Sequence, residues 1–482
     1  MNLENKMSFE ELKENKSDIK RIFFYRICGT GMGACACLLK GQGFDIEGGD
    51  NKFYPPMSQY LETTGIKTLN LTEMDSNYLK EFDLIVVGNV VPRDSDDAKI
   101  IESCGTKYIS FPGALGALVL CDQNVVGITG THGKTTTTYF LTQMFENMGM
   151  TPGYFIGGVM EGRAPSRLGD GSYFFIESDE YDSAYFEKIS KFRLYSMDHL
   201  ILTSLEYDHA DIFENIEQIK DEFRELFVQV KGRYIFCQDY IENENLASEI
   251  SVNELIFYGN KTEMGPTNIR IENNKTLFDV RYKGEIIPFK TNIIGNHNIL
   301  NITSGIIFAL SEGIPQEKIK SSVNFLSLVK RRQEFRGQFG KSVVIDDFAH
   351  HPKAVEVTIL AIKDNYPNKK LIVVMEPNSA TARSSIFQAE FTTSLNIADE
   401  VFVTKLPRAT TAKGAENLDL TKMVLDLERC NTPAKIINNL VELLAELSKY
   451  KGSENVILIL SNGTCLGLWQ SSFVDELEKP SR

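Results

Sequence analysis

Residues 127–137, Gly-Ile-Thr-Gly-Thr-His-Gly-Lys-Thr-Thr-Thr, carry the residue types that bind a nucleoside triphosphate. The apolar residues 125–128 predict a strand that enters the glycine turn, and Lys134 opens the helix that follows. Backbone N–H groups and the positive helix end would face the phosphates, Lys134 would add a charge, and the Thr135 hydroxyl could ligate Mg²⁺. Ile128 replaces the first glycine of the strict phosphate-loop pattern, but the strand–turn–helix order still favours a phosphate site over an ordinary Gly/Thr-rich turn. The candidate phosphate ligands are Gly130, Thr131, His132, Gly133, Lys134, Thr135 and Thr136.

A second predicted strand ends in acidic residues. Glu177 closes the apolar run 173–177 and is followed by Asp179, Glu180 and Asp182. A carboxylate beside a phosphate loop offers the oxygen ligand that Mg²⁺ prefers near the β- and γ-phosphates. We therefore expect Glu177 to hold the ion, and Glu180 and Asp182 to lie in a solvated acidic turn.

A third acidic cluster, Glu206-x-Asp208-His209-x-Asp211, follows the strand predicted over residues 199–203. A lone histidine is often only packed or hydrogen-bonded. Two neighbouring acids at the carboxyl edge of a sheet favour His209 as the ligand of a second metal ion.

Two later segments offer contacts to the nucleotide. Asn298 and Asn301 begin a predicted helix, where their amides could either cap the helix or hydrogen-bond the edge of a purine ring. Arg331 and Arg332 precede the last third of the chain; a basic cluster is usually a solvated face, but here it could also clamp the triphosphate.

The segment Asp346-Asp347-Phe348-Ala349-His350-His351-Pro352 follows another predicted strand. Asp346 or Asp347 would suit the hydroxyl pair of a ribose, and a histidine would suit proton transfer or substrate contact. Adjacent histidines on extended backbone point in opposite directions. We therefore expect at most one of His350 and His351 to face a cleft.

The turn Gly29-Thr30-Gly31-Met32-Gly33-Ala34 after a buried strand matches a relaxed dinucleotide fingerprint, and Asp50 falls where an acidic ribose ligand is expected. This pattern alone leaves three alternatives open: an NAD site, a site for another pyrophosphate ligand, and a purely structural turn.

The elements that position these residues form three successive series of alternating strands and helices, beginning near residues 22, 121 and 326. This alternation predicts parallel, doubly wound sheets with ligand groups at the carboxyl ends of the strands. Residues 269–294 differ, because three short alternating runs separated by turns predict an antiparallel meander. A helix over 299–310 has apolar residues on one face.

The composition excludes several classes. A chain of 482 residues with 42% hydrophobic and 24% charged residues predicts about three globular domains. The net charge of −14 argues against nucleic acid as a partner. We expect a cytoplasmic protein without membrane insertion, since the start of the chain has no signal-like apolar stretch and the eight cysteines form no Cys-x-x-Cys pair.

Taken together, these motifs resemble the Mur ligases, the ATP-dependent amide ligases of peptidoglycan assembly, over about residues 21–475. Within the family, the chain is most similar to the branch that attaches recycled L-alanyl-γ-D-glutamyl-meso-diaminopimelate to UDP-N-acetylmuramate. The segments that carry this similarity are 54–58, 88–91, 130–137, 176–182, 205–213, 346–352 and 461–463.

The resemblance implies an α/β fold with three domains. They are a Rossmann-like domain for UDP-N-acetylmuramate (21–120), a central phosphate-loop ATPase domain with the small β meander (121–326), and a Rossmann-like domain for the amino substrate (327–482). A polar tail (1–20) would precede them. It also implies ATP and Mg²⁺ as cofactors and small-molecule partners only, in a monomer or homodimer.

The resemblance also assigns roles to the candidate residues. Lys134 would contact the β- and γ-phosphates, Thr135 and Glu177 one Mg²⁺, and His209 a second. His350 would contact or deprotonate the amine. Asn298 and Asn301 would contact adenine, Asp346 or Asp347 the ribose, and Arg331 or Arg332 the phosphates. The UDP-sugar ligands would be Gly29, Thr30, Gly31, Met32, Gly33, Asp50 and Asn89.

One departure concerns the acceptor. The tripeptide ligases tend to carry an arginine where this chain has Asn378, and Arg383 lies five residues further on. Arg383 is therefore the candidate for a peptide carboxylate, and an L-alanine acceptor stays the main alternative. An NAD-dependent oxidoreductase and a switch-type ATPase are more distant alternatives.

Overall fold

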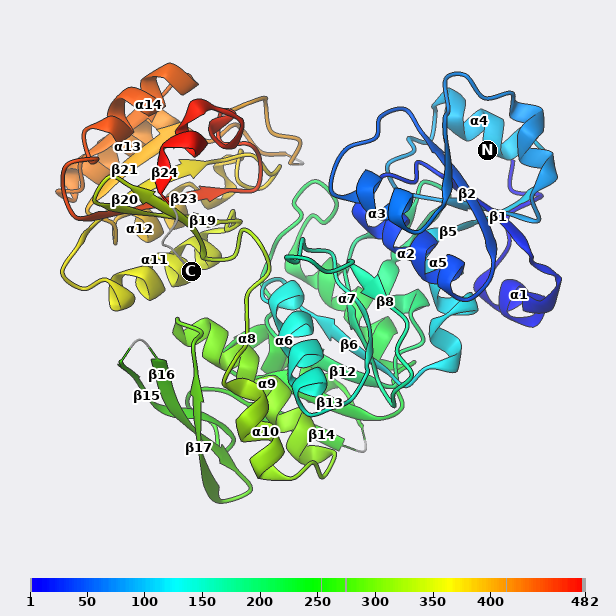
Figure 1. Ribbon diagram of the computed structural model, residues 1–482, viewed down its shortest axis with the longest axis horizontal. Helices are drawn as coiled ribbons and strands as arrows, with labels where there is room; N and C mark the ends of the chain where they lie inside the picture. The colour runs from blue at the N-terminus through cyan, green and yellow to red at the C-terminus, as the bar shows by residue number, and fades with distance from the viewer. Residues whose placement is uncertain (1, 253, 274, 413, 479–482) are drawn as a thin grey trace.

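The computed structural model describes residues 2–252, 254–273, 275–412 and 414–478, which form three α/β units (Figure 1). The first unit is a parallel sheet in the order β3-β2-β1-β4-β5. Its elements are β1 (Arg21–Tyr25), α2 (Thr30–Gly41), β2 (Asp45–Asp50), α3 (Met57–Thr63), β3 (Lys67–Asn70), β4 (Leu84–Val87), α4 (Asp96–Ser103), β5 (Lys107–Ser110) and α5 (Phe111–Leu118).

The start of the chain differs from the expected polar tail. Helix α1 (Phe9–Glu14) buries Leu12, and the N–H of Met7 donates to the carbonyl of Tyr108 at 2.9 Å on the free edge of β5. Helix α1 packs against α5, and the N–H of Tyr108 also donates to the carbonyl of Asn5, so this segment lies against the first sheet.

The central unit has a seven-stranded sheet in the order β14-β13-β12-β6-β9-β7-β8, in which β8 alone runs antiparallel to its neighbour. Its strands are β6 (Val125–Thr129), β7 (Gly153–Phe155), β8 (Ser166–Arg167), β9 (Phe174–Glu177), β12 (His199–Leu202), β13 (Arg233–Cys237) and β14 (Glu254–Tyr258). The helices are α6 (Lys134–Asn147), α7 (Ile216–Phe227), α8 (Ile241–Glu249), α9 (Asn296–Ser311) and α10 (Gln316–Val323), and a hairpin pairs β10 (Asp182–Ala184) with β11 (Glu187–Ser190).

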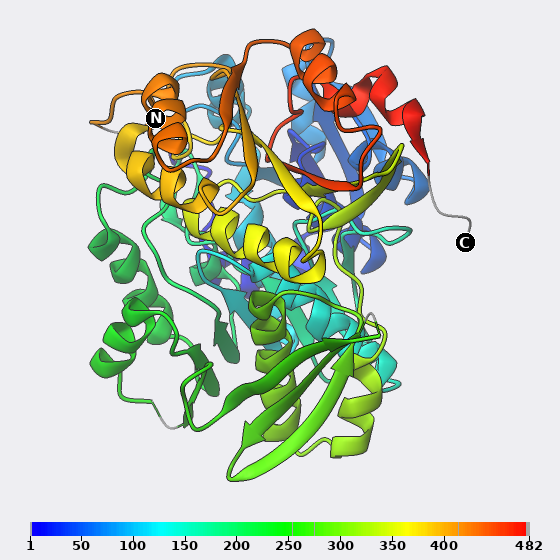
Figure 2. The ribbon, with the colours of Figure 1, turned by 90° about the vertical axis from the view of Figure 1, so that its left-hand side faces the viewer.

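The predicted antiparallel meander is confirmed. It consists of β15 (Gly265–Glu272), β16 (Lys275–Tyr282) and β17 (Glu285–Thr291). In Figure 2 these strands extend from the end of the molecule that lies opposite the C-terminal sheet. Phe278 and Val280 are buried, so one face of the meander joins the core that α6 and α9 share.

The third unit has a seven-stranded sheet in the order β22-β21-β20-β23-β19-β18-β24. Strand β18 runs antiparallel to both of its neighbours, β19 and β24. Its strands are β18 (Glu334–Phe339), β19 (Ser342–Asp347), β20 (Lys370–Glu376), β21 (Glu400–Thr404), β22 (Ala434–Ile437), β23 (Asn455–Ser461) and β24 (Leu477–Glu478). The helices are α11 (Pro352–Asn365), α12 (Gln388–Leu395), α13 (Leu420–Arg429) and α14 (Leu440–Ser448). Short 3₁₀ helices lie at 16–18, 76–81, 120–122, 191–194, 385–387, 468–470 and 472–476.

The first and third units both lie against the central unit, as Figure 1 shows. The predicted parallel sheets are confirmed in all three. Within the described residues, no helix is both long enough and apolar enough to cross a membrane.

Candidate functional site

The phosphate loop joins β6 to α6 through two glycines with left-handed backbone. Gly130 has φ 127° and Gly133 has φ 86°. A Cβ atom on Gly130 would lie 2.5 Å from the carbonyl oxygen of Ser204, and one on Gly133 would lie 2.9 Å from the side chain of Asn301. Both positions therefore require glycine, for the backbone angle and for the close approach.

The segment after β12 holds this loop in place. The N–H of Thr131 donates to the carbonyl of Ser204 at 2.9 Å, and the N–H of His132 donates to the hydroxyl of Ser204 at 2.8 Å. The hydroxyl of Thr131 donates to the carbonyl of Glu206 at 3.0 Å. Since β12 and β6 are adjacent strands, the acidic cluster after β12 is fixed beside the loop.

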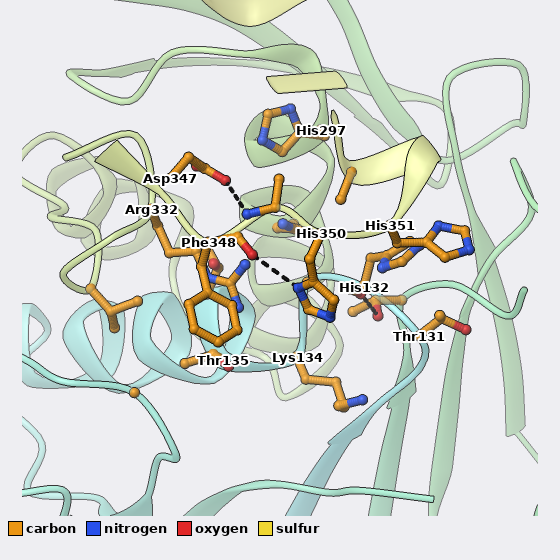
Figure 3. Close-up of a pocket in the computed structure, with 18 of the residues that line it drawn as sticks. Thr131, His132, Lys134, Thr135, His297, Arg332, Asp347, Phe348, His350 and His351 are labelled. Atoms are coloured by element: carbon orange, nitrogen blue, oxygen red, sulfur yellow. Dashed lines mark hydrogen bonds between the residues drawn. The ribbon is translucent and has the colours of Figure 1, made fainter. Parts of the chain in front are cut away.

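A cavity of about 440 Å³ lies over the loop, between the central unit and the third unit (Figure 3). It brings together residues that are more than 200 positions apart in the sequence. The predicted site residues that line it are Thr131, His132, Gly133, Lys134, Thr135, Thr136, Glu177, His209, Asn298, Asn301, Arg331, Arg332, Asp347 and His350.

Lys134 lies at the centre of a buried charge network. Its Nζ donates to the carbonyl of Gly130 at 2.7 Å and to Oε2 of Glu180 at 3.1 Å. Burial lowers the pKa of Lys134, but the charges of Glu180 and Asp179 outweigh that effect and hold the pKa above its usual range. Lys134 is therefore a fixed cation at the start of α6.

Glu180 corrects the prediction of a solvated acidic turn. Its side chain is only 3% exposed, and it pairs with both Lys134 and His209. Burial raises its pKa, but the two cations outweigh burial and lower the pKa to about 2. Asp182, by contrast, lies near the surface and pairs with Lys188, as expected for a solvated acid.

Glu177 is placed as a metal ligand should be. One carboxylate oxygen accepts from the hydroxyl of Thr135 at 2.5 Å, and the other accepts from the N–H of Gly157 at 2.7 Å. Burial and the neighbouring Asp179 raise the pKa of Glu177. A half-buried acid with a raised pKa next to a threonine hydroxyl fits a divalent cation, which would supply the missing positive charge.

His209 also lines the cavity, with Nε2 at 3.3 Å from Oε1 of Glu180. Burial lowers the pKa of His209, but the hydrogen bond that its ring donates to Glu180 and the charge of Asp208 outweigh burial and raise the pKa to about 9. The imidazole is therefore protonated at neutral pH, and an ion bound at Nε2 would have to replace that proton and the contact with Glu180.

The asparagines of α9 do not cap their helix. The residue at its N-cap is Gly295, and no side chain satisfies the first N–H groups. The amide nitrogen of Asn298 donates to the carbonyl of Ile294 at 2.9 Å. The capping alternative is therefore wrong for Asn298, and both asparagines lie on the wall of the cavity.

The two arginines have different surroundings. Arg331 pairs with Asp346 at 3.3 Å and its guanidinium also donates to the carbonyl of Ser461, so it is engaged within the third unit. Arg332 has no salt-bridge partner among the described residues, and its guanidinium lies 5.2 Å from the ring centre of Phe348. Of the two arginines, Arg332 is thus the one that is free to contact a ligand in the cavity.

Of the two aspartates at the end of β19, one is likewise paired within the third unit and the other faces the cavity. Asp346 is fully buried, pairs with Arg331 and Arg336, and does not line the cavity. Asp347 lines it, accepting from the N–H groups of Gln333 and Ala349 at 2.7 and 2.8 Å. Asp347 is therefore the better placed of the two to contact a ribose.

Both adjacent histidines line the cavity, which corrects the expectation that only one would do so. His351 is the N-cap residue of α11, and the chain bends there so that the two rings face different parts of the same cavity (Figure 3). Nδ1 of His350 lies 2.9 Å from the carbonyl of Phe348, which requires the proton on Nδ1 and leaves Nε2 as the acceptor. Burial lowers the pKa of His350, so its ring is neutral at neutral pH.

The predicted UDP-sugar residues lie elsewhere, at the carboxyl edge of the first sheet. Gly29, Thr30, Gly31, Met32 and Gly33 form the start of α2, and none of them lines the cavity. The carboxylate of Asp50 accepts from the N–H of Cys28 at 2.9 Å, and the side chain of Asn89 is exposed.

Gly130 and Arg383 also lie outside the cavity wall. Gly130 faces Lys134 through its carbonyl. The guanidinium of Arg383 is buried and donates to the backbone carbonyls of Asn378 and Ala409. In this conformation Arg383 organises the loop between β20 and α12 and does not present its charge to a substrate.

The cavity wall also contains residues that the sequence patterns did not single out, among them Tyr240, His297 and Phe348. Tyr240 follows the end of β13 by three residues, a position from which strand-end reasoning could have selected it. His297 and Phe348 stand inside segments that were recognised for their polar neighbours.

Comparison with known proteins gives a consistent result over nearly the whole chain. Three models of Mur ligase domains match it: the family's catalytic domain at residues 21–120, the middle domain at 128–309 and the glutamate ligase domain at 331–463. The chain is 33% identical over 472 residues to the UDP-N-acetylmuramate–L-alanyl-γ-D-glutamyl-meso-2,6-diaminoheptandioate ligase of Haemophilus influenzae, covering 95% of this chain and all of that protein. The chain belongs to the Mur ligase family.

Two further matches lie within the Mur ligases. The crystal structure of a murein peptide ligase from Psychrobacter arcticus is similar with a TM-score of 0.68 and 26% identity, covering 96% of this chain and all of that one. The UDP-N-acetylmuramate–L-alanine ligase of Ligilactobacillus salivarius is 30% identical but covers 80% of this chain and 83% of its own length. Family membership excludes the NAD-dependent oxidoreductase alternative for the chain as a whole.

Proposed function

We propose that this Mur ligase joins the lactyl carboxylate of UDP-N-acetylmuramate to the amine of L-alanine in the tripeptide L-alanyl-γ-D-glutamyl-meso-diaminopimelate, using ATP. The observation that carries the proposal is the cavity, in which a phosphate loop of the central unit faces Arg332, Asp347 and His350 of the third unit. The similarity over 95% of the chain to a ligase named for this tripeptide supports the choice of acceptor.

The arrangement suits carboxylate activation. A carboxylate is a poor electrophile, and transfer of the γ-phosphoryl group of ATP would convert it into an acyl phosphate with phosphate as the leaving group. That transfer moves negative charge, so fixed cations should supply most of the stabilisation. Lys134 and Arg332 are two of the cations that line the cavity.

Thr135 and Glu177 would hold Mg²⁺, which would neutralise charge on the β- and γ-phosphates. We retain His209 as the candidate ligand of a second ion, in competition with its contact to Glu180. Asn298, Asn301 and Asp347 would hold the nucleoside. The turn at residues 29–33, with Asp50 and Asn89, would hold the UDP group at the first sheet.

His350 would accept the proton of the attacking amine. Its proton is on Nδ1, fixed by the carbonyl of Phe348, so Nε2 has a free lone pair towards the cavity. Its lowered pKa keeps the ring neutral and able to act as a base at neutral pH.

L-Alanine is the second candidate acceptor, favoured by the 30% identity to an L-alanine ligase and by the internal engagement of Arg383. A direct experiment is to measure phosphate release and product mass with ATP, Mg²⁺ and UDP-N-acetylmuramate, adding either the tripeptide or L-alanine. We expect turnover with the tripeptide and product of the corresponding mass.

Turnover with L-alanine but not with the tripeptide would assign the chain to the alanine ligases. Phosphate release without UDP-N-acetylmuramate would favour a switch-type ATPase. No release with either acceptor would refute the ligase proposal.

A further inference from the structure

Three side chains that are neither Mg²⁺ ligands nor proton acceptors in the proposed reaction converge beside the phosphate loop. They are His132 in the loop, Glu206 after β12, and His351 at the N-terminus of α11. Nε2 of His132 lies 3.1 Å from Nδ1 of His351 and 3.1 Å from Oε2 of Glu206. In Figure 3 the imidazoles of His132 and His351 lie side by side, with ring centres 4.6 Å apart.

These spacings match the edges of a metal coordination shell. The three ligand atoms all lie within 4.8 Å of one another. A tetrahedral ion holds its nitrogen and oxygen ligands at about 2.0–2.2 Å, which places neighbouring ligand atoms roughly 3.3 Å apart. The two observed distances of 3.1 Å are close to that value.

Hydrogen bonding alone satisfies the cluster poorly. Nε2 of His132 carries at most one proton, yet it faces both Nδ1 of His351 and Oε2 of Glu206. That carboxylate oxygen is buried, and its 3.1 Å contact with Nε2 of His132 does not have the geometry of a hydrogen bond.

We propose that His132, Glu206 and His351 form a site for a borderline divalent transition metal ion such as Zn²⁺. Two imidazoles and one carboxylate leave one tetrahedral position for water or a substrate atom. The donor set differs from that of Thr135 and Glu177, whose oxygens suit Mg²⁺. The proposal does not depend on which acceptor the ligase uses.

The site would connect two units of the protein. His132 and Glu206 belong to the central unit, whereas His351 begins the first helix of the third sheet. An ion held by all three would therefore fix the third unit over the phosphate loop. By linkage, a ligand that brings the two units together should also tighten metal binding, and the metal should tighten the binding of that ligand.

The test uses full-length protein treated with a chelator and then titrated with Co²⁺ in the presence of excess Mg²⁺, which occupies the oxygen site. We expect about one Co²⁺ per chain with the intense visible absorption of a four-coordinate ion. His351→Asn and Glu206→Gln should each weaken Co²⁺ binding at least tenfold. Changing a residue that only hydrogen-bonds to a ligand lowers metal affinity roughly 10–100-fold, and removing the ligand itself should cost at least as much.

Two controls separate this site from the predicted Mg²⁺ site. Glu177→Gln should retain the absorption, as should His199→Asn, since His199 lies on β12 and accepts from the N–H of Arg233. Circular dichroism of each variant shows whether it is folded. Co²⁺ binding of equal affinity in the folded His351→Asn variant, or binding lost in Glu177→Gln, would overturn the proposal, as would no binding by the wild-type protein.

Magnesium-dependent phosphate release, measured on the same samples, reports on the ligase separately. Activity without Co²⁺ binding would refute the metal site alone. Co²⁺ binding without activity would leave the metal site supported and refute the proposed reaction.

Discussion

The protein contains two glycine turns that each join a buried strand to a helix, and their surroundings differ sharply. At residues 130–133 the backbone is left-handed at both glycines, and Lys134, Glu177 and Glu180 surround the turn with buried charge. At residues 29–33 no glycine has a positive φ, and the neighbours include Met57 and Phe111. Asp50 at the end of β2 also lies beside this turn and accepts from the N–H of Cys28, but the helix of this turn begins with Thr30 and not with a lysine. The same local fold therefore has different chemistry in the two places, because only the turn at 130–133 is followed by a lysine that pairs with neighbouring carboxylates.

Replacing the lysine of the charged turn should have the largest effect. Lys134→Ala removes a cation aimed at the phosphates and leaves Glu180 buried beside a cavity, so phosphate release should fall at least about a thousandfold. Lys40→Ala removes a lysine from the last turn of α2, the helix of the other turn, and should leave the rate within about twofold. An equal loss of phosphate release in the two folded variants would contradict the proposed difference between the two glycine turns.

Glu180 and Asp182 form a matched pair of acids in the charged region. Glu180→Gln keeps the size of the side chain but removes the charge that orients Lys134 and His209, so kcat should fall roughly 10–100-fold. Asp182→Asn alters an acid paired with the exposed Lys188 and should not change kcat measurably. Steady-state kinetics on both variants test the comparison, which fails if Asp182→Asn is the more damaging.

The pair of Glu180 and His209 also predicts a pH dependence of stability in chelator-treated protein. The pKa of His209 is raised from 6.5 to about 9, so its contribution is complete below pH 6.5 and is lost as the pH rises through 9. The pKa of Glu180 is lowered from 4.5 to about 2, so its contribution is complete above pH 4.5 and is lost as the pH falls towards 2.

Thermal unfolding should show this dependence. The Tm difference between the wild type and Glu180→Gln should be largest between pH 4.5 and 6.5 and should shrink by pH 9.5. A Tm difference that is constant from pH 5 to pH 9.5 would show that the two side chains do not interact in this way.

The smallest effects are expected at the uncharged turn. A Cβ on Gly33 would lie 2.1 Å from the sulfur of Met57, so Gly33→Ala should cost about 1–3 kcal/mol of stability through overpacking. No atom lies within 4 Å of a Cβ on Gly29, so Gly29→Ala should leave the Tm unchanged. Calorimetry gives the Tm of both variants, and a larger Tm loss for Gly29→Ala than for Gly33→Ala would refute this prediction.

Local patterns predicted the phosphate loop and placed Glu177 beside it, because a strand, its turn and the following helix are contiguous in sequence. Parallel pairing then placed His209 beside them, since strand ends meet at one edge of a sheet. These relations needed no knowledge of side-chain packing.

Other features depended on contacts between distant segments. The burial of Glu180 follows from Lys134 and His209 closing over it, which an acidic run in the sequence does not reveal. Asp347 is a better candidate than Asp346 for contacting the ribose, because Asp346 forms salt bridges with two arginines. The internal role of Arg383 depends on the loop that folds around it.

In the proposed reaction, the charged cavity transfers the γ-phosphoryl group of ATP to a carboxylate of the substrate. This transfer can be followed with UDP-N-acetylmuramate labelled with ¹⁸O in its lactyl carboxylate, by mass spectrometry of the phosphate released during turnover with the tripeptide. We expect one labelled oxygen in each phosphate, since the bond from carbon to that oxygen breaks when the amine attacks the acyl phosphate. Amide product accompanied by unlabelled phosphate would contradict it.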